Sequence, residues 1–271
     1  MLLNQFVFRI FGFLAHRDFG KKFLLKYNNK ASREQDSQYL SLGLDRSLGL
    51  MKLDTALYKL YGKTYSETDG MWSEHLILFS ALSQSNFKIE TILEIGTFNG
   101  ETTKILSILF PNSKIETYDL PISEMMQDQI YNYATKNQKL INERDLNLKN
   151  LNNVKFIEKN SLELLNNQTK YDLIWVDGAH GYPMATIDIT NAIRLLSNTG
   201  LAICDDVYLK SKIIDKFYRS TASIETLEEF NKSGLILFKL VLKRLGYFFN
   251  NPKKYQKFLA IFWKTNYFSQ T

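Results

Sequence analysis

Three carboxylates and one imidazole follow two apolar runs in the second half of the chain. The first run ends in Asp177, and His180 comes three residues later in a loop flanked by glycines. The second run ends in Asp205 and Asp206. The carboxyl ends of neighbouring parallel strands meet at one edge of a sheet, where ligands bind, so we expect these four side chains to lie close together.

These residue types suit a hard cation with a base beside it. Asp177, Asp205 and Asp206 would repel one another and raise one another's pKa unless a positive charge lay among them. Oxygen ligands favour Mg²⁺, with Mn²⁺ or Ca²⁺ next. His180 would then act as a general base next to metal-bound substrate. Taken singly, each aspartate could instead cap a helix or form a turn.

A glycine-containing turn earlier in the chain is a second candidate site. An apolar run that includes Glu94 turns through Gly96 and Gly100 and continues with helical spacing. The glycines let the backbone approach a ligand, and the first amide groups of a helix face the same space. Asp119 ends the next apolar run, 23 positions after Gly96, where a carboxylate takes the ribose hydroxyls of a nucleoside cofactor. Asn160, after a third run, would face the base.

Alternating strand and helix patterns position these residues and predict an α/β fold with a largely parallel sheet. We expect strands at 92–95, 114–119, 154–157, 173–176 and 201–204, two further strands within 235–264, and helices at 71–82, 122–148 and 183–197. Residues 1–70 are expected to form an amino-terminal helical extension, and 71–271 the main domain. A helix is also expected at 2–15, with one apolar face that packs on the domain or on a second copy of the chain.

Composition narrows the function classes. The chain of 271 residues has 34 basic and 28 acidic residues, a mild excess that is not typical of nucleic-acid binding. Its one cysteine, Cys204, excludes an internal disulfide and a multi-cysteine zinc cluster, and fits a reducing, cytoplasmic location. The 2–15 segment is too short to span a membrane, and Arg9 makes it a poor signal peptide.

Residues from about Met71 to Val207 resemble the SAM-dependent methyltransferases of the Rossmann-like class. The turn at 93–100 looks like the E-x-G-x-x-x-G motif of catechol and caffeoyl-CoA type O-methyltransferases. The segments 176–180 and 203–207 are similar to the family of macrolide-sugar O-methyltransferases and cephalosporin-hydroxylase-like proteins.

The resemblance implies a Rossmann-like, doubly wound, mostly parallel seven-stranded sheet with helices on both faces. It also implies a SAM-dependent, Mg²⁺- or Mn²⁺-dependent O-methyltransferase that acts on a hydroxyl of a small molecule, with a sugar or glycosylated metabolite preferred. Asp177 would serve both cofactor and metal, and His180 would be the base. The other implied contacts are Glu94, Gly96, Thr97, Asn99 and Gly100 with the methionine part of SAM, Asp119 with the ribose, Asn160 and Ser161 with the adenine, and Asp205 and Asp206 with the metal.

Three other functions remain open at this point. A nucleic-acid methyltransferase fits the positive charge, but Asp-Gly-Ala-His stands after the fourth strand where amino-methylating enzymes carry Asn/Asp-Pro-Pro followed by an aromatic residue. An NAD-binding oxidoreductase fits the glycine turn and Asp119 but leaves the later carboxylates unexplained. A non-catalytic binding protein would use the basic, aromatic segment 235–264, which could also touch a membrane surface. Self-association through the amino-terminal helix is a further expectation.

Overall fold

The computed structural model describes residues 33–67, 69–121, 124, 134–210, 220–243 and 257–265. The expected helix at 2–15 lies outside the described residues. So do parts of two other segments singled out above, 125–133 in the polar region after the second strand and 244–256 in the basic segment near the carboxyl end. The expected domain boundary at residue 70 stays a prediction.

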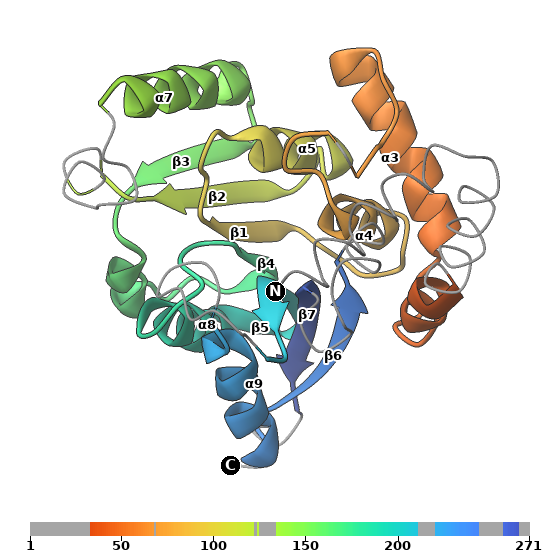
Figure 1. Ribbon diagram of the computed structural model, residues 1–271, viewed down its shortest axis with the longest axis vertical. Coiled ribbons are helices and arrows are strands. Elements are labelled where there is room, and N and C mark those ends of the chain that lie inside the picture. The colour runs from red at the N-terminus through yellow and green to blue at the C-terminus, as the bar shows by residue number, and fades with distance from the viewer. Residues whose placement is uncertain are drawn as a thin grey trace, which may run out of the picture.

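Seven strands form one sheet, which confirms the predicted fold class (Figure 1). The strand order is β3-β2-β1-β4-β5-β7-β6, and every pairing is parallel except those of β7. The strands are β1 Thr91–Ile95, β2 Lys114–Asp119, β3 Val154–Glu158, β4 Tyr171–Val176, β5 Leu196–Tyr208, β6 Ile236–Leu242 and β7 Lys257–Lys264. In this order β1 and β4 are central neighbours, so their carboxyl ends lie side by side.

Continuous apolar runs in the central strands are explained by helices on both faces. Side chains alternate between the faces of a strand, so Ile92 packs in one buried core and Leu93 in the other. Leu173 and Ile174 divide in the same way. Consecutive apolar residues of these strands thus contribute to two separate cores, one on each face of the sheet.

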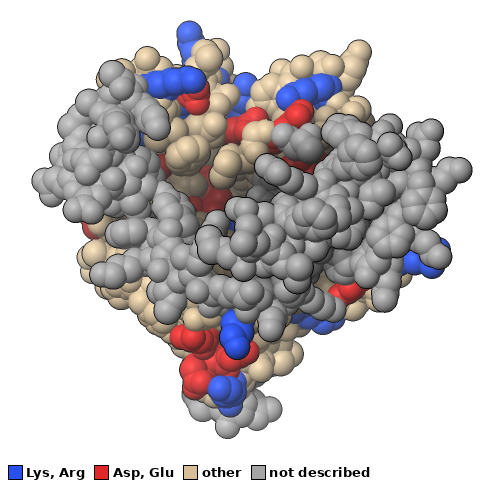
Figure 2. Space-filling view, viewed as in Figure 1, with Lys and Arg blue, Asp and Glu red and all other residues tan. Residues whose placement is uncertain are grey.

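The helices of the two layers come from different parts of the chain (Figure 1). The described α-helices are α3 Arg46–Tyr61, α4 Glu74–Ser83, α5 Glu101–Leu109, α7 Ala134–Leu148, α8 Met184–Leu195 and α9 Ala222–Lys232, and η2 Ser161–Asn166 is a 3₁₀ helix. The first core includes Leu53 of α3, Phe79 of α4 and Ile105 of α5. The second includes Ile189 of α8 and Leu227 of α9. At the lower tip of Figure 2, acidic and basic side chains gather where α9 lies.

Strand and helix boundaries mostly match the sequence pattern, with two instructive differences. β2 spans the predicted residues, whereas α4 begins at Glu74 rather than at residue 71. β5 begins at Leu196, before the predicted 201, because α8 ends at Leu195 and the register against β4 shifts between Tyr171 and Leu173. In the part of the chain that the structure describes, no helix is long and apolar enough to cross a membrane.

Candidate functional site

The turn after β1 requires glycine. Gly96 has φ +101°, and a Cβ atom there would lie 2.2 Å from the backbone oxygen of Asp177. The approach is this close because the Asp177 amide donates to the Ile95 carbonyl (2.8 Å) where β1 and β4 end together. Gly100, at φ +72°, precedes α5 and has no side chain to cap it, and the first amide groups of this helix face the turn, where Asn99 accepts from one of them. The predicted glycine turn is therefore present.

Glu94 is fully buried beneath this turn and has only neutral donors among the described residues. The hydroxyls of Thr103 and Thr117 both donate to its Oε2 atom, the latter over 2.6 Å. Burial raises the pKa of Glu94 to about 7, although the two hydroxyl donors lower it. Thr97 joins the same set, since its Oγ1 lies 2.6 Å from that of Thr117. Glu94 and Thr97 therefore belong to one hydrogen-bonded group of side chains, which Thr117 connects.

Asp119 stands at the end of β2 with backbone donors on both oxygens. Its Oδ2 accepts from the Phe98 amide (2.6 Å) and its Oδ1 from the Leu120 amide (2.8 Å). Burial raises the pKa of Asp119 to about 6. Asn99, in the turn, accepts from the Glu101 amide through its side chain (3.2 Å). Asp119 is thus fixed against the glycine turn, and each oxygen keeps a further lone pair.

Asn160 and Ser161, the residues predicted to face a base, begin η2. The side-chain oxygen of Asn160 accepts from the Leu162 amide (3.0 Å), and its amide group donates to Glu124 (2.8 Å). The Ser161 side chain hydrogen-bonds Asp188. Both side chains therefore have partners within the chain, and their role toward adenine stays a prediction.

Asp188 is a site residue that the sequence analysis missed. It is buried on α8, burial raises its pKa to about 6, and a Cβ at Gly178 would come 2.9 Å from its Oδ2. A signal was available, because Asp188 lies between Ala185 and Ala192 at helical spacing on the face that packs inward. A carboxyl on such a face needs a specific reason.

Asp205 and Asp206 lie together on one side of β5, although neighbouring residues of a regular strand point to opposite faces. The pairing with β7 advances by two residues from Ala260 to Phe258 while β5 advances by three from Cys204 to Val207. Asp206 adopts φ +51° within this bulge. The extra residue re-aims a side chain. The bulge is the local reason why both carboxylates reach the same partner.

That partner is a lysine. The Nζ atom of Lys243, which directly follows β6, lies 2.5 Å from Asp205 Oδ2 and 2.6 Å from Asp206 Oδ1. The Nζ of Lys257, at the start of β7, lies 2.5 Å from Asp206 Oδ2. Burial alone would raise the pKa of Asp206, but Lys243, His180 and Lys257 together lower it. Both aspartates carry their charge next to ammonium groups.

The predicted magnesium site is not confirmed. Among the described residues, no group of three or more His, Cys, Asp or Glu side chains could hold a metal ion. The physical reason is that an ion bridging Asp205 and Asp206 would need an oxygen of Asp206, and both are already held, Oδ1 by Lys243 and Oδ2 by Lys257. A divalent ion beside a buried ammonium group would also be repelled. This donor set does not fit Mg²⁺.

His180 does lie beside the carboxylates, as predicted. Its Nε2 is 3.7 Å from Asp177 Oδ1 and 3.9 Å from Asp206 Oδ2. These distances are longer than hydrogen bonds. Burial lowers the pKa of His180 more than the nearby carboxylates raise it. Burial and the adjacent Asp205 carboxylate raise the pKa of Asp177 well above its usual range. The neutral imidazole of His180 is therefore available to accept a proton.

The ring side chains of Trp72, His75, Tyr182 and Tyr208 divide into two groups by exposure. Trp72, His75 and Tyr208 are buried, and the His75 ring stacks on that of Trp175 with centroids 5.3 Å apart. Tyr182, two residues after His180, is 56% exposed, and its hydroxyl donates to Glu225 (2.8 Å). Among these four residues, Tyr182 alone has an exposed ring. Acidic atoms are also visible inside a recess in the upper half of Figure 2.

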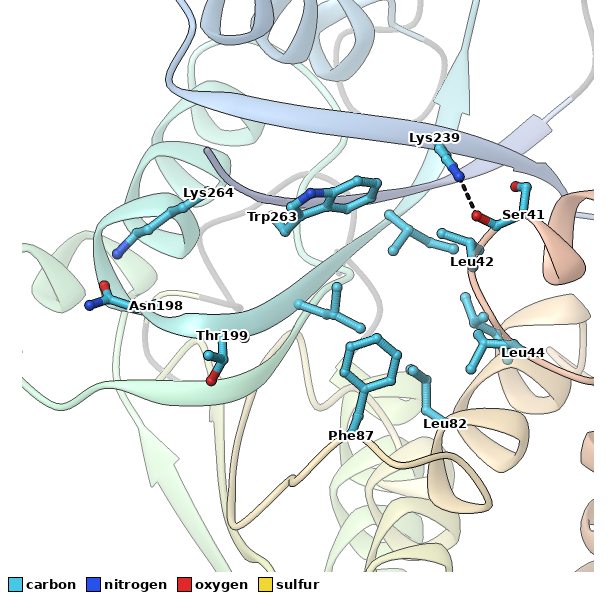
Figure 3. Close-up of a pocket in the computed structure, with 14 residues that line it drawn as sticks. Ser41, Leu42, Leu44, Leu82, Phe87, Asn198, Thr199, Lys239, Trp263 and Lys264 are labelled. Atoms are coloured by element: carbon cyan, nitrogen blue, oxygen red, sulfur yellow. Dashed lines mark hydrogen bonds between the residues drawn. The ribbon is translucent and has the colours of Figure 1, made fainter. Parts of the chain in front are cut away.

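An apolar cavity of about 270 Å³ lies elsewhere (Figure 3). Its lining includes Leu201 near the amino-terminal end of the β4-paired part of β5, Trp263 near the end of β7, and Lys239, which donates to the Ser41 carbonyl. Since β7 runs antiparallel to β5, these residues mark the edge opposite the aspartates. Ligands of open α/β sheets bind at the carboxyl edge, so we place the candidate site there.

Comparisons with known proteins were made for sequence and for fold. Residues 93–207 match a family model described as a methyltransferase domain. This matched segment runs from the glycine turn to the aspartate pair. No curated protein sequence matches the chain.

Several solved structures share the arrangement of elements. A candidate rRNA methylase from Clostridium thermocellum is 14% identical with a TM-score of 0.50, over 72% of this chain and 100% of that chain. The O-methyltransferase TomG from Streptomyces achromogenes, solved with SAM, is 17% identical with a TM-score of 0.47, over 85% and 95%. The SAH-bound methyltransferase PaMTH1 from Podospora anserina is 16% identical with a TM-score of 0.47, over 80% and 88%. At these identities the likeness concerns the fold.

Proposed function

We propose that this chain, whose residues 93–207 match a methyltransferase domain, is a SAM-dependent methyltransferase that methylates a hydroxyl oxygen of a small molecule. The observation that carries the proposal is the imidazole of His180 at the carboxyl edge, with 11% of its side chain exposed and Asp177 and Asp206 within 4 Å of its Nε2 atom. A base in this position removes a hydroxyl proton. The glycine turn and Asp119 lie at the same edge.

The residues of the first half of the edge fit SAM. Gly96 allows the close approach of the Asp177 backbone that brings the ends of β1 and β4 together, and α5 begins at the same edge, where a helix amino terminus favours a carboxylate such as that of the methionine part. Asp119 presents two oxygens with free lone pairs to a pair of ribose hydroxyls. Thr97 and Asn99 stand in the same turn, while Asn160 and Ser161 would approach the adenine. These roles form part of the proposal.

The transfer follows from the chemistry of these groups. SAM supplies the methyl group on a sulfonium, whose carbon–sulfur bond breaks as the acceptor oxygen attacks, with the electron pair leaving on sulfur. His180 takes the hydroxyl proton onto a ring nitrogen. The resulting imidazolium charge is stabilised by the Asp206 carboxylate, whose Oδ2 lies 3.9 Å from Nε2 and whose pKa the charged imidazole lowers. The chain's main task is to hold oxygen, methyl group and base in line.

A sugar or glycosylated metabolite is the acceptor class that we propose. Support comes from Tyr182, which follows His180 by two residues, has an exposed ring, and is fixed by its hydrogen bond to Glu225. A flat ring of this kind packs against the apolar face of a pyranose. The magnesium requirement that the sequence resemblance implies does not fit the lysine-filled cluster, so no step of this mechanism uses a metal.

Binding and turnover can be separated experimentally. SAM is titrated calorimetrically into the wild type, His180→Ala and Asp119→Ala, and SAH release is then measured with a panel of monosaccharides, glycosides and diols. We expect His180→Ala to bind SAM as the wild type does but to lose about 10²- to 10⁴-fold in turnover. Asn198→Ala, an exposed polar change at the opposite edge, is the control. Undiminished turnover in His180→Ala would remove the base from the mechanism.

A further inference from the structure

We propose that Lys243 is the resident cation of this site: its ammonium group takes the position between Asp205 and Asp206 where the sequence predicts a divalent ion, and methyl transfer here needs no metal. The inference that methyl transfer needs no metal rests on the proposed function. The place of Lys243 between the two aspartates does not depend on it.

The first support is geometric. Lys243 Nζ lies within 2.5 and 2.6 Å of one oxygen on each aspartate, as short as charge-assisted hydrogen bonds become. The side chains of all three residues are at least nine-tenths buried. A buried lysine is rare unless it is paired. Its position between two carboxylates therefore indicates a built site.

The second support is that the backbone fixes Lys243 in place. Its amide donates to the Lys257 carbonyl (3.0 Å), and its carbonyl accepts from the Glu74 amide at the start of α4 (3.1 Å). The residue is thus held between β7 and α4. For the side chain to make room for an ion, its ammonium group would have to leave a buried, doubly paired position.

The third support is the balance of charge. Asp177, Asp205 and Asp206 bring three carboxyl groups together, and Lys243 and Lys257 bring two ammonium groups. Lys257 occupies the second oxygen of Asp206. The repulsion that led us to expect a divalent ion is therefore already offset by two cations from the chain. A further dication would leave the cluster with an excess of positive charge.

Lys243 would act as a positioning residue in this arrangement. It keeps Asp206 on the side of His180, since Asp206 Oδ2 is the atom 3.9 Å from the imidazole. Unlike a metal ion, the ammonium group has no ligands that exchange. Loss of the lysine leaves a cavity lined by carboxylates, and that is the kind of site that binds a hard dication.

The test uses Mn²⁺ as the probe and electron paramagnetic resonance as the readout, so it does not depend on finding the acceptor. Protein dialysed against EDTA is titrated with Mn²⁺, with and without SAM. We expect no stoichiometric Mn²⁺ binding by the wild type, and stoichiometric binding by Lys243→Met. Lys239→Met is the matched control because this lysine stands four residues earlier on the chain, toward the opposite edge, and donates to Ser41; it should behave as the wild type.

A second variant covers the case in which Lys243→Met does not fold. If Lys243→Met does not fold, Lys243→Met combined with Asp205→Asn removes one charge of each sign and should fold without binding Mn²⁺. Stoichiometric Mn²⁺ binding by the wild type overturns the inference in either case.

Once an acceptor is known, EDTA should leave wild-type turnover unchanged within about twofold. Turnover that EDTA abolishes and Mg²⁺ restores overturns the inference while it leaves the proposed function standing. If the wild type does not bind SAM, the proposed function is wrong. The Mn²⁺ titration then still decides whether Lys243 excludes a metal ion from the aspartate pair.

Discussion

The two halves of the carboxyl edge handle buried carboxyl groups in opposite ways. At the ends of β1 and β2, Glu94 and Asp119 accept from hydroxyl and backbone donors, and burial raises their pKa values to about 7 and about 6. At the bulge in β5, burial would raise the pKa of Asp205 and Asp206, but Lys243 in particular lowers both. The comparison teaches that, among these buried carboxyl groups, the type of partner decides whether the pKa is raised or lowered.

The largest expected effect comes from removal of Lys243 from the aspartate cluster at the β5 bulge, which we call the charged half of the edge. Lys243→Met leaves two buried carboxylates without their shared partner, and breaking such a pair costs about 3–5 kcal/mol of folding free energy. Urea unfolding at pH 7 measures this loss. The same experiment on Lys239→Met should give a midpoint close to that of the wild type. Equal midpoints for both variants would mean that the buried cluster contributes no more than a surface lysine.

Stability is expected to depend on pH through the other half of the edge, at the ends of β1 and β2, which we call the neutral half because hydroxyl and backbone groups donate to its carboxyl groups. Because the pKa of Glu94 is raised from 4.5 to about 7, the folded state binds the proton more tightly than the unfolded state. The contribution of this group to stability is therefore greatest below pH 4.5 and falls as pH rises to about 7, by about 3 kcal/mol. Unfolding of the wild type and Glu94→Gln is compared from pH 4.5 to 8. A difference between the two proteins that does not change with pH would contradict the assignment.

A smaller effect is expected at the turn that joins the two halves. An alanine at a left-handed position costs about 1–2 kcal/mol, and Gly96 and Gly62 both have such a φ. Only at Gly96 would the new Cβ meet backbone, the Asp177 oxygen, whereas nothing lies within 4 Å at Gly62. Gly96→Ala should therefore lose at least about tenfold in SAM affinity, and Gly62→Ala should not. Calorimetry on both variants separates local strain from loss of the turn.

The same comparison explains what the sequence could and could not predict. The neutral half is local: Glu94, Gly96 and Gly100 stand within seven residues, and Asp119 ends the next strand, so apolar runs and glycine spacing suffice. The strand positions follow for the same reason, since buried parallel strands are continuous apolar runs. The aspartate pair and His180 were also found, because each follows such a run.

The charged half depends on distant residues. Lys243 reaches Asp205 only because β7 inserts between β5 and β6, which brings positions 38 residues apart together. No motif marks Lys243 in the sequence, and no periodic pattern announces the bulge that turns Asp206 inward. The carboxylates were therefore recognised and their counter-charge was not, which is why a metal was expected.

One calorimetric measurement tests the central claim that this edge is a SAM site that works without a metal. SAM is titrated in EDTA-containing buffer into the wild type and into Asp119→Ala. The account predicts binding of one SAM per chain to the wild type in the absence of any divalent ion, and a loss of that heat in Asp119→Ala. No heat with the wild type until Mg²⁺ is added, or equal heats for the two proteins, would contradict it.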